Sequence, residues 1–89
     1  MKVRVRITGR VQGVSYRAWT RATAVRMNLT GWVRNEADGA VLAQISGPET
    51  MVATMLEALW KGPPAAIVDN VEVSDAETAE DTDDFRITR

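Results

Sequence analysis

Apolar residues follow two different periods along this chain, and the order in which the periods alternate constrains the fold most strongly. Lys2–Thr8 alternates apolar and polar side chains at every position, which is typical of a half-buried strand. From about Tyr16 to Met27 the apolar spacing becomes three and four residues, which predicts a helix. The two-residue period then returns over residues 31–46 and predicts a hairpin with its turn at 36–39.

The second half of the chain repeats this alternation. Gly47-Pro48 opens a second predicted helix with proline at its first position, and Gly62-Pro63-Pro64 ends it. A fourth strand is expected at 67–73, an acidic solvated loop at 74–84, and a short edge strand at 85–87. The order βαββαβ predicts an α+β fold, a ferredoxin-like sandwich with two helices on one face of a mainly antiparallel sheet.

A chain of 89 residues has room for one core, so we expect a single domain spanning residues 1–89. The second helix is expected to present Trp60 on its apolar face together with residues of the core. The residues predicted to pack between helices and sheet are Ala18, Ala22, Val25, Val52, Met55, Leu56 and Leu59 from the helices and Val3, Val5, Ile7, Val33, Val41, Ile45, Val71 and Val73 from the strands.

Cysteine and histidine are both absent from the chain. Disulfides, zinc sites built on Cys or His, a Ser-His triad and a phosphohistidine intermediate are therefore excluded. We expect neither a metal nor a cofactor. The apolar runs are too short to span a membrane, and the N-terminus lacks the apolar region of a signal peptide, so a cytoplasmic location is expected.

The formal net charge of −1 conceals a segregation of charge along the chain. Residues 1–34 carry eight basic side chains and no acid, whereas residues 35–89 carry twelve acids and three bases, so the two parts carry +8 and −9. One interpretation is an anion site, for phosphate or nucleic acid, in the basic part. The other is that the basic part simply forms ion pairs with the acidic part.

The loop between the first strand and the first helix has the features of an anion site. A strand-to-helix loop presents unpaired backbone N–H groups at a helix N-terminus, and Gly13 lets the chain curl into a nest of such groups. Arg17 lies in the first helical turn, where a cation opposes the helix dipole at a cost of about 0.3–1 kcal/mol. An anion bound between them explains this placement. The alternative is an ordinary glycine loop followed by a solvent-facing arginine.

Asn35 ends the second predicted strand, directly before the hairpin turn. Asparagine is a favoured turn residue, and this alone explains its position. The connections, however, place the hairpin and the start of the first helix near the same edge of the sheet. A side-chain amide there can hold a water molecule by hydrogen bonds without titrating. An asparagine beside an anion nest could therefore direct a water at a bound phosphorus atom.

Two stretches of the sequence together resemble the acylphosphatase family. Residues 7–17 read ITGRVQGVSYR and are similar to its first signature, a glycine followed by Val-Gln-Gly-Val, an aromatic residue and Arg. Residues 31–35 read GWVRN and, with Gly39, Val41 and Gly47, match the second signature. Tyr16 stands where the family usually has Phe or Met, and its hydroxyl needs a partner if it is buried.

The resemblance implies a metal-independent hydrolase that cleaves the carboxyl-phosphate bond of acyl phosphates. Inorganic phosphate would be both product and inhibitor. The expelled carboxylate has a conjugate-acid pKa of about 4, so no general acid is needed. The resemblance assigns catalysis to Arg17 and Asn35, with Asn35 orienting the water. It assigns phosphate binding to Arg17 and the loop amides, that is, to Gln12, Gly13, Val14, Ser15, Tyr16 and Arg17.

Two other functions are compatible with this fold. The first is a non-catalytic phosphate-sensing or regulatory domain, which would bind phosphate without turnover. The second is a single-strand RNA binder, which stacks bases on aromatic residues of its central strands. The strands expected to be central, the first and the fourth, contain no aromatic residue. This lack of aromatic residues argues against an RNA binder. We expect a monomer that acts on a small-molecule acyl phosphate and binds neither nucleic acid nor membrane.

Overall fold

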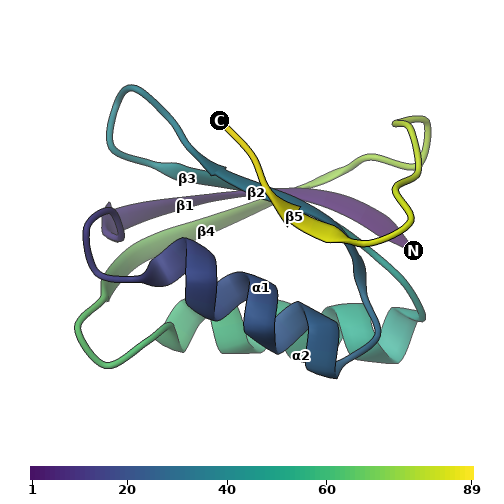
Figure 1. Ribbon diagram of the computed structural model, residues 1–89, viewed down its shortest axis with the longest axis horizontal. Coiled ribbons are helices and arrows are strands. Elements are labelled where there is room, and N and C mark those ends of the chain that lie inside the picture. Colours follow the sequence, from purple (N-terminus) through teal and green to yellow (C-terminus); the bar gives the residue numbers. More distant parts are fainter.

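The computed structural model describes all 89 residues and has the predicted order of elements (Figure 1). Each predicted strand and helix is present, with bounds that shift by a few residues. The elements are β1 (Lys2–Arg10), α1 (Tyr16–Arg26), β2 (Thr30–Asn35), β3 (Val41–Ser46), α2 (Glu49–Lys61), β4 (Ile67–Asp75) and β5 (Phe85–Ile87). Pro48 directly precedes α2 instead of occupying its first position.

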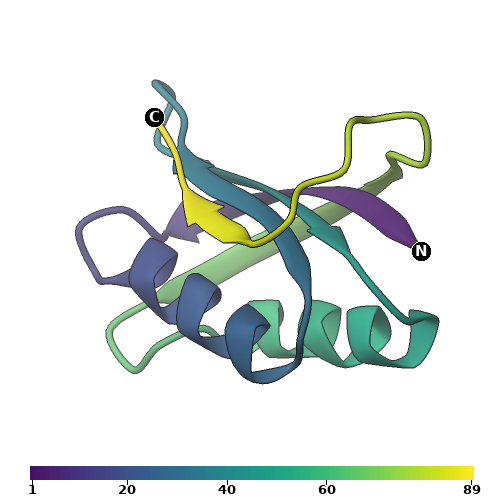
Figure 2. The same cartoon turned by 45° about the vertical axis from the view of Figure 1, so that its right-hand side comes forward.

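The five strands form one sheet in the order β4-β1-β3-β2-β5. Every neighbouring pair is antiparallel except β2 and β5, which are parallel. Both helices lie on the same face of the sheet, as Figures 1 and 2 show. The ferredoxin-like α+β fold is therefore confirmed. The expectation that the fourth strand is central is wrong, because β4 forms an edge and β3 lies beside β1; β3 also contains no aromatic residue.

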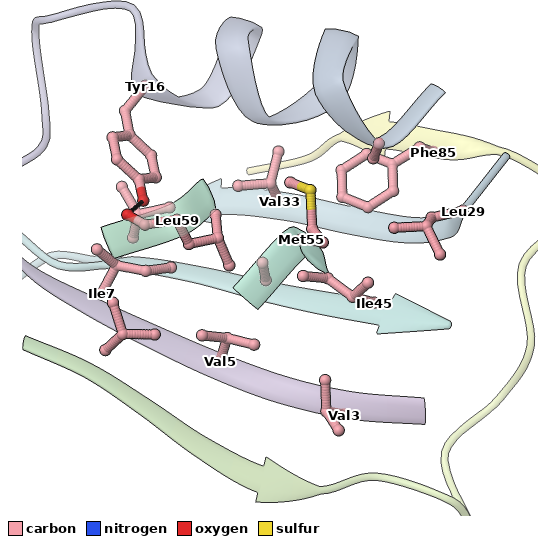
Figure 3. Packing of buried hydrophobic residues seen from close by; sticks show 14 of the residues in the cluster. Val3, Val5, Ile7, Tyr16, Leu29, Val33, Ile45, Met55, Leu59 and Phe85 are labelled. Carbon is pink, nitrogen blue, oxygen red and sulfur yellow. Dashed lines mark hydrogen bonds between the residues drawn. The ribbon is translucent and has the colours of Figure 1, made fainter. Parts of the chain in front are cut away.

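The core lies between the sheet and the two helices (Figure 3). Most of the predicted packing residues are buried there, and Leu56 is partly buried against them. The confirmed core residues are Val3, Val5, Ile7, Val33, Val41, Ile45, Val52, Met55, Leu59 and Val71. The strand periodicity therefore identified the buried face of β1, β2 and β3 correctly.

The predicted core face of α1 is wrong. Ala18, Ala22 and Val25 are exposed, Val25 to 49%. Two threonines occupy the buried face instead, and each hydroxyl donates a 2.8 Å hydrogen bond to a backbone carbonyl four residues earlier. Because the helix itself satisfies these hydroxyls, their methyl groups can face the core at little cost. The buried residues of α1 are Tyr16, Thr20, Thr23 and Ala24.

Trp60, expected on the apolar face of the second helix, and Val73, expected in the core, are both about half exposed. Trp60 lies in the last turn of α2 and is 51% exposed, and Val73 on β4 is 49% exposed. Val73 pairs with fully buried Val5, but its strand is the edge of the sheet and has a neighbour on one side only. The alternation of apolar residues is the same in central and edge strands, so it does not reveal this difference.

The acidic segment after β4 is anchored to the sheet, contrary to the expectation of a fully solvated loop. The Lys2 ammonium donates a 2.6 Å hydrogen bond to the Ala79 carbonyl, and the Gln44 side chain donates a 3.0 Å hydrogen bond to the Glu80 carbonyl. Lys2 also forms a 2.6 Å ion pair with the exposed carboxylate of Asp81. Because Lys2 begins β1, this loop lies at the opposite end of β1 from the strand-to-helix loop.

Three basic residues of the first 34 pair with acids from the rest of the chain. The pairs are Lys2 with Asp81, Arg6 with Asp38, and Arg34 with Glu36. The ion-pairing interpretation therefore holds for these residues. The Lys2 side chain is buried, but Asp81 is exposed and the other two pairs are open to solvent in part, and such pairs contribute little stability. No helix of the structure is long and apolar enough to cross a membrane.

Candidate active site

The loop from Val11 to Ser15 turns sharply between β1 and α1. Gly13 has a φ of 74° and Ser15 a φ of 66°, so two of its residues adopt the left-handed conformation. Ser15 occupies the N-cap of α1, yet its side chain makes no capping hydrogen bond. A chain that passes through left-handed positions directs successive N–H groups toward the same side. The conformation is that of an anion nest.

The backbone N–H groups of this loop have no acceptor within the protein. The backbone hydrogen bonds outside the regular elements include none donated by residues 12–18, and the first helical donor is Trp19, which bonds to the Ser15 carbonyl at 3.0 Å. Unpaired N–H groups and the positive end of the helix dipole therefore coincide at the start of α1. Such a helix start binds anions.

Gln12 attaches this loop to the β2–β3 hairpin. Its side-chain amide donates to the carbonyls of Glu36 and Ala40, at 2.8 and 2.9 Å. These bonds hold the loop beside the end of β2, where Asn35 lies. The Gln12 side chain is thus occupied within the protein, and the side chain of Val14 packs against the core. These two predicted site residues can contact an anion only through their backbone N–H groups.

A cavity of about 370 Å³ opens between the loop, the first turn of α1 and the ends of β2 and β5. It brings together five of the predicted site residues from two separate parts of the sequence, but not the side chains of Gln12 and Val14. Three lining residues, Val11, Ala18 and Ile87, were not predicted. The full lining is Val11, Gly13, Ser15, Tyr16, Arg17, Ala18, Asn35 and Ile87.

Arg17 is the one charged side chain that lines this cavity. It is partly buried and forms no ion pair, whereas four other basic side chains of the molecule do. The first turn of α1 contains no acid that would offset its charge. The guanidinium group is therefore available to an anion in the cavity, and its fork of parallel donors fits two phosphate oxygens.

Asn35 is the last residue of β2 and pairs with Val41 of β3. Its side-chain oxygen Oδ1 is buried and accepts no hydrogen bond from the protein. Leaving such an acceptor unsatisfied costs about 1–3 kcal/mol, so native structures rarely keep one without a use. Asn35 itself lines the cavity, so this unsatisfied carboxamide lies at the edge of the space that a bound molecule would occupy.

Tyr16, the departure from the family signature, is accommodated without an unpaired hydroxyl. The side chain is buried, and its hydroxyl donates a hydrogen bond to the Leu59 carbonyl on α2 (Figure 3). Burial raises the pKa of Tyr16 above its usual value of 10, so this donor keeps its proton. A Cβ at Gly62 would lie 2.8 Å from the tyrosine ring, so the glycine leaves room for the ring.

Metal-ligating side chains do not gather anywhere in the structure in groups of three or more His, Cys, Asp or Glu residues. The positive charge around the cavity comes instead from Arg17 and the backbone N–H groups of residues 12–18. This set of donors suits a small anion with several oxygens. It offers no carboxylate or imidazole that could take up a proton at neutral pH.

Comparison with known proteins gives one consistent result. A family model described as Acylphosphatase matches residues 3–87. An acylphosphatase of Rhizobium meliloti (strain 1021) is 58% identical over 96% of this chain and 90% of its own. The crystal structure of acylphosphatase from Bacillus subtilis matches with a TM-score of 0.94 and 33% identity, over 99% of this chain and 98% of that one. An acylphosphatase structure from Coxiella burnetii matches with a TM-score of 0.92 and 38% identity, over 98% and 90% of the two chains.

Proposed function

This chain belongs to the acylphosphatase family and hydrolyses acyl phosphates to a carboxylate and inorganic phosphate, and we propose that the cavity at the start of α1 is its active site. One observation carries this assignment. Asn35, whose side-chain oxygen is buried and has no partner in the protein, lines the same cavity as Arg17, whose guanidinium group forms no ion pair. Hydrolysis at phosphorus requires one group that orients the attacking water and another that holds the phosphoryl oxygens.

The phosphoryl group binds at the loop and the helix start. Arg17 donates two parallel hydrogen bonds to two of its oxygens, and the N–H groups of residues 12–17 donate to the remaining ones. These donors are fixed before the substrate arrives, because Gln12 ties the loop to the hairpin. Charge that develops on the phosphoryl oxygens in the transition state is thereby stabilised without any rearrangement of the protein.

Asn35 orients the attacking water. Its Oδ1 accepts a hydrogen bond from the water and so turns a lone pair of that water toward phosphorus. The leaving carboxylate is stable at neutral pH, so the absence of a histidine acid does not limit the reaction. The water proton passes to an oxygen of the substrate's own phosphoryl group, since no side chain lining the cavity is a base at neutral pH.

We expect the reaction to be independent of metal ions, because Arg17 and the loop N–H groups supply the charge that a cation otherwise provides. The test is hydrolysis of benzoyl phosphate with and without excess chelator. The rate is expected to be the same in both. A loss of activity on chelation that magnesium restores would contradict the mechanism. No hydrolysis at all, with retained phosphate binding, would instead favour a phosphate-sensing domain.

Replacing Gly13 tests the nest. Alanine at this position meets no atom within 4 Å, so its effect comes from the backbone, which has a φ of 74°. A left-handed non-glycine residue costs about 1–2 kcal/mol, and Gly13→Ala is expected to distort the loop and weaken phosphate binding about tenfold. The measurement is the inhibition constant of inorganic phosphate.

A matched variant separates backbone conformation from the presence of a side chain. Asparagine tolerates the left-handed region better than alanine, so Gly13→Asn is expected to retain more of the phosphate affinity. Equal losses in both variants would show that any side chain obstructs the site and that the conformation of Gly13 is not decisive.

The monomeric state and the cytoplasmic location stay predictions.

A further inference from the structure

We propose that Ala18 and Ile87 form a subsite for the acyl group, and that the enzyme prefers acyl phosphates whose acyl part is apolar. This inference rests on the proposed active site, because it assigns the part of the same cavity that the phosphoryl group and water do not use. The lining residues divide by chemistry. Ser15, Arg17 and Asn35 have polar side chains, whereas Ala18 and Ile87 are apolar and open to solvent.

The other two apolar lining residues offer a ligand much less exposed surface to contact. Val11 and Tyr16 are each only 1% exposed, so they form the floor of the cavity beneath the loop. Ile87, by contrast, is 43% exposed and is among the few large apolar side chains left in contact with solvent. Of these exposed side chains, Ile87 is the one that lines the cavity of Arg17 and Asn35.

The sheet holds Ile87 in place. β5 runs parallel to β2, with Ile87 opposite Val33, and the N–H of Thr88 donates a 2.8 Å hydrogen bond to the Val33 carbonyl. Val33 and Asn35 are two residues apart on β2 and therefore point to the same face of the sheet. Ile87 lies opposite Val33, so it faces the same side as the proposed water-orienting residue.

The helix completes the arrangement. The guanidinium group of Arg21 donates a 3.1 Å hydrogen bond from Nε to the Phe85 carbonyl, which fixes the start of β5 against α1. Arg17 and Ala18 lie one turn earlier on α1, and Ile87 lies two residues later on β5. This antiparallel approach of α1 and β5 (Figure 2) brings Ile87 to the helix start, beside the phosphate donors.

The charges of the cavity determine which acyl groups fit. Arg17 is its one charged lining side chain and is assigned to the phosphoryl group. A second anionic group on the acyl part would therefore find no partner. An alkyl or phenyl acyl group, in contrast, would cover the exposed carbon atoms of Ile87 and remove both surfaces from water, which is favourable.

The experiment compares two substrates that share the reacting bond and differ in the acyl group, benzoyl phosphate and acetyl phosphate. The quantity measured is the ratio of their kcat/KM values. Ile87→Ala is expected to lower this benzoyl-to-acetyl ratio about tenfold, the low end of the effect of removing apolar contacts from a binding pocket. The inhibition constant of inorganic phosphate is expected to stay the same, because phosphate does not occupy the subsite.

The matched control is Ile67→Ala. Ile67 is also an exposed isoleucine on an edge strand, but it lies on β4, at the other edge of the sheet, and does not line the cavity. Its substitution is expected to leave the ratio unchanged. A second variant, Ala18→Leu, places a larger side chain in the subsite on the helix side. It is expected to lower the ratio as well, because the benzoyl group needs the space that leucine fills.

The outcomes separate the subsite from the active site. Equal losses with both substrates in Ile87→Ala, or unchanged ratios in both Ile87→Ala and Ala18→Leu, would overturn the subsite and leave the roles of Arg17 and Asn35 intact. The active site itself would be contradicted by different variants, namely Arg17 and Asn35 variants that retain full turnover.

Discussion

Replacing Arg17 by lysine is expected to lower turnover at least about 10³-fold, the scale on which an arginine contributes to phosphoryl transfer. The same substitution is expected to weaken inorganic phosphate binding by a factor on the order of 10 to 100, as the loss of charge-assisted hydrogen bonds does. Lysine keeps the positive charge but offers a single ammonium group in place of two parallel N–H donors. The variant therefore tests the fork of donors and not the charge alone.

The surroundings of Arg17 explain why this loss would be large. No other charged side chain lines the cavity, and no acid pairs with Arg17 in the free protein. A neighbouring cation could not replace it, and its substitution would not release a buried partner. The effect on the stability of the protein without ligand is therefore expected to be small, which keeps the variant folded and interpretable.

Thermal unfolding with and without phosphate measures binding independently of turnover. A ligand stabilises the folded state by RT ln(1 + [L]/Kd), so the phosphate-induced rise in Tm should shrink in Arg17→Lys. The matched control is Arg26→Lys, at the other end of α1, where the arginine makes only a 3.4 Å hydrogen bond to Thr23. If Arg17→Lys retains both the Tm shift and the activity, the anion site is assigned to the wrong residue.

The sequence predicts the buried face correctly for strands whose apolar residues alternate strictly. It predicts the wrong face for α1, where two of the buried residues are threonines. The alternation of β1 identified Val3, Val5 and Ile7 as core residues, and all three are buried. On α1 the count of apolar residues pointed to the wrong face. Thr20 and Thr23 bury their methyl groups while their hydroxyls bond to the helix backbone. The burial of these threonines depends on hydrogen bonds within the helix, which a pattern of hydrophobicity does not reveal.

Some residues of the candidate site could be predicted from the sequence, and others are revealed only by the fold. Arg17 and Asn35 were predicted from signatures that are contiguous in sequence, although Asn35 by itself was better explained as a turn residue. Ile87 carried no such signal, because only the pairing of β5 with β2 brings it to a loop more than seventy residues away. Gln12 was predicted as a phosphate ligand through its backbone N–H group, and no pattern indicated that its side chain would bind the hairpin.

Asn35→Ala is expected to separate catalysis from binding. The rate constant kcat should fall about 10²- to 10³-fold, the loss seen when one positioned hydrogen-bonding group is removed from an active site. Phosphate binding should stay near normal, because in the proposed mechanism the carboxamide holds the water and Arg17 holds the phosphate. The expected combination is therefore an almost inactive variant with a retained phosphate-induced rise in Tm.

Stability gives a second, independent readout for this variant. Asn35 Oδ1 is a buried acceptor without a partner in the protein, so its removal relieves a desolvation cost. Without ligand, Asn35→Ala is accordingly expected to unfold at the same temperature as the wild type or slightly higher. A residue that served the hairpin turn would show the opposite result, a lower Tm with little change in kcat.

The matched control is Asn70→Ala, which removes an exposed asparagine on β4 whose side chain makes only a 3.5 Å hydrogen bond to Glu72. It should change neither kcat nor the phosphate-induced rise in Tm. An Asn35→Ala variant with close to full activity would show that the water is oriented by another group and that Asn35 only ends the strand. A variant that loses phosphate binding together with kcat would instead indicate that the carboxamide contacts the phosphoryl group. Removing a group that contacts only the water would not lower the affinity for phosphate.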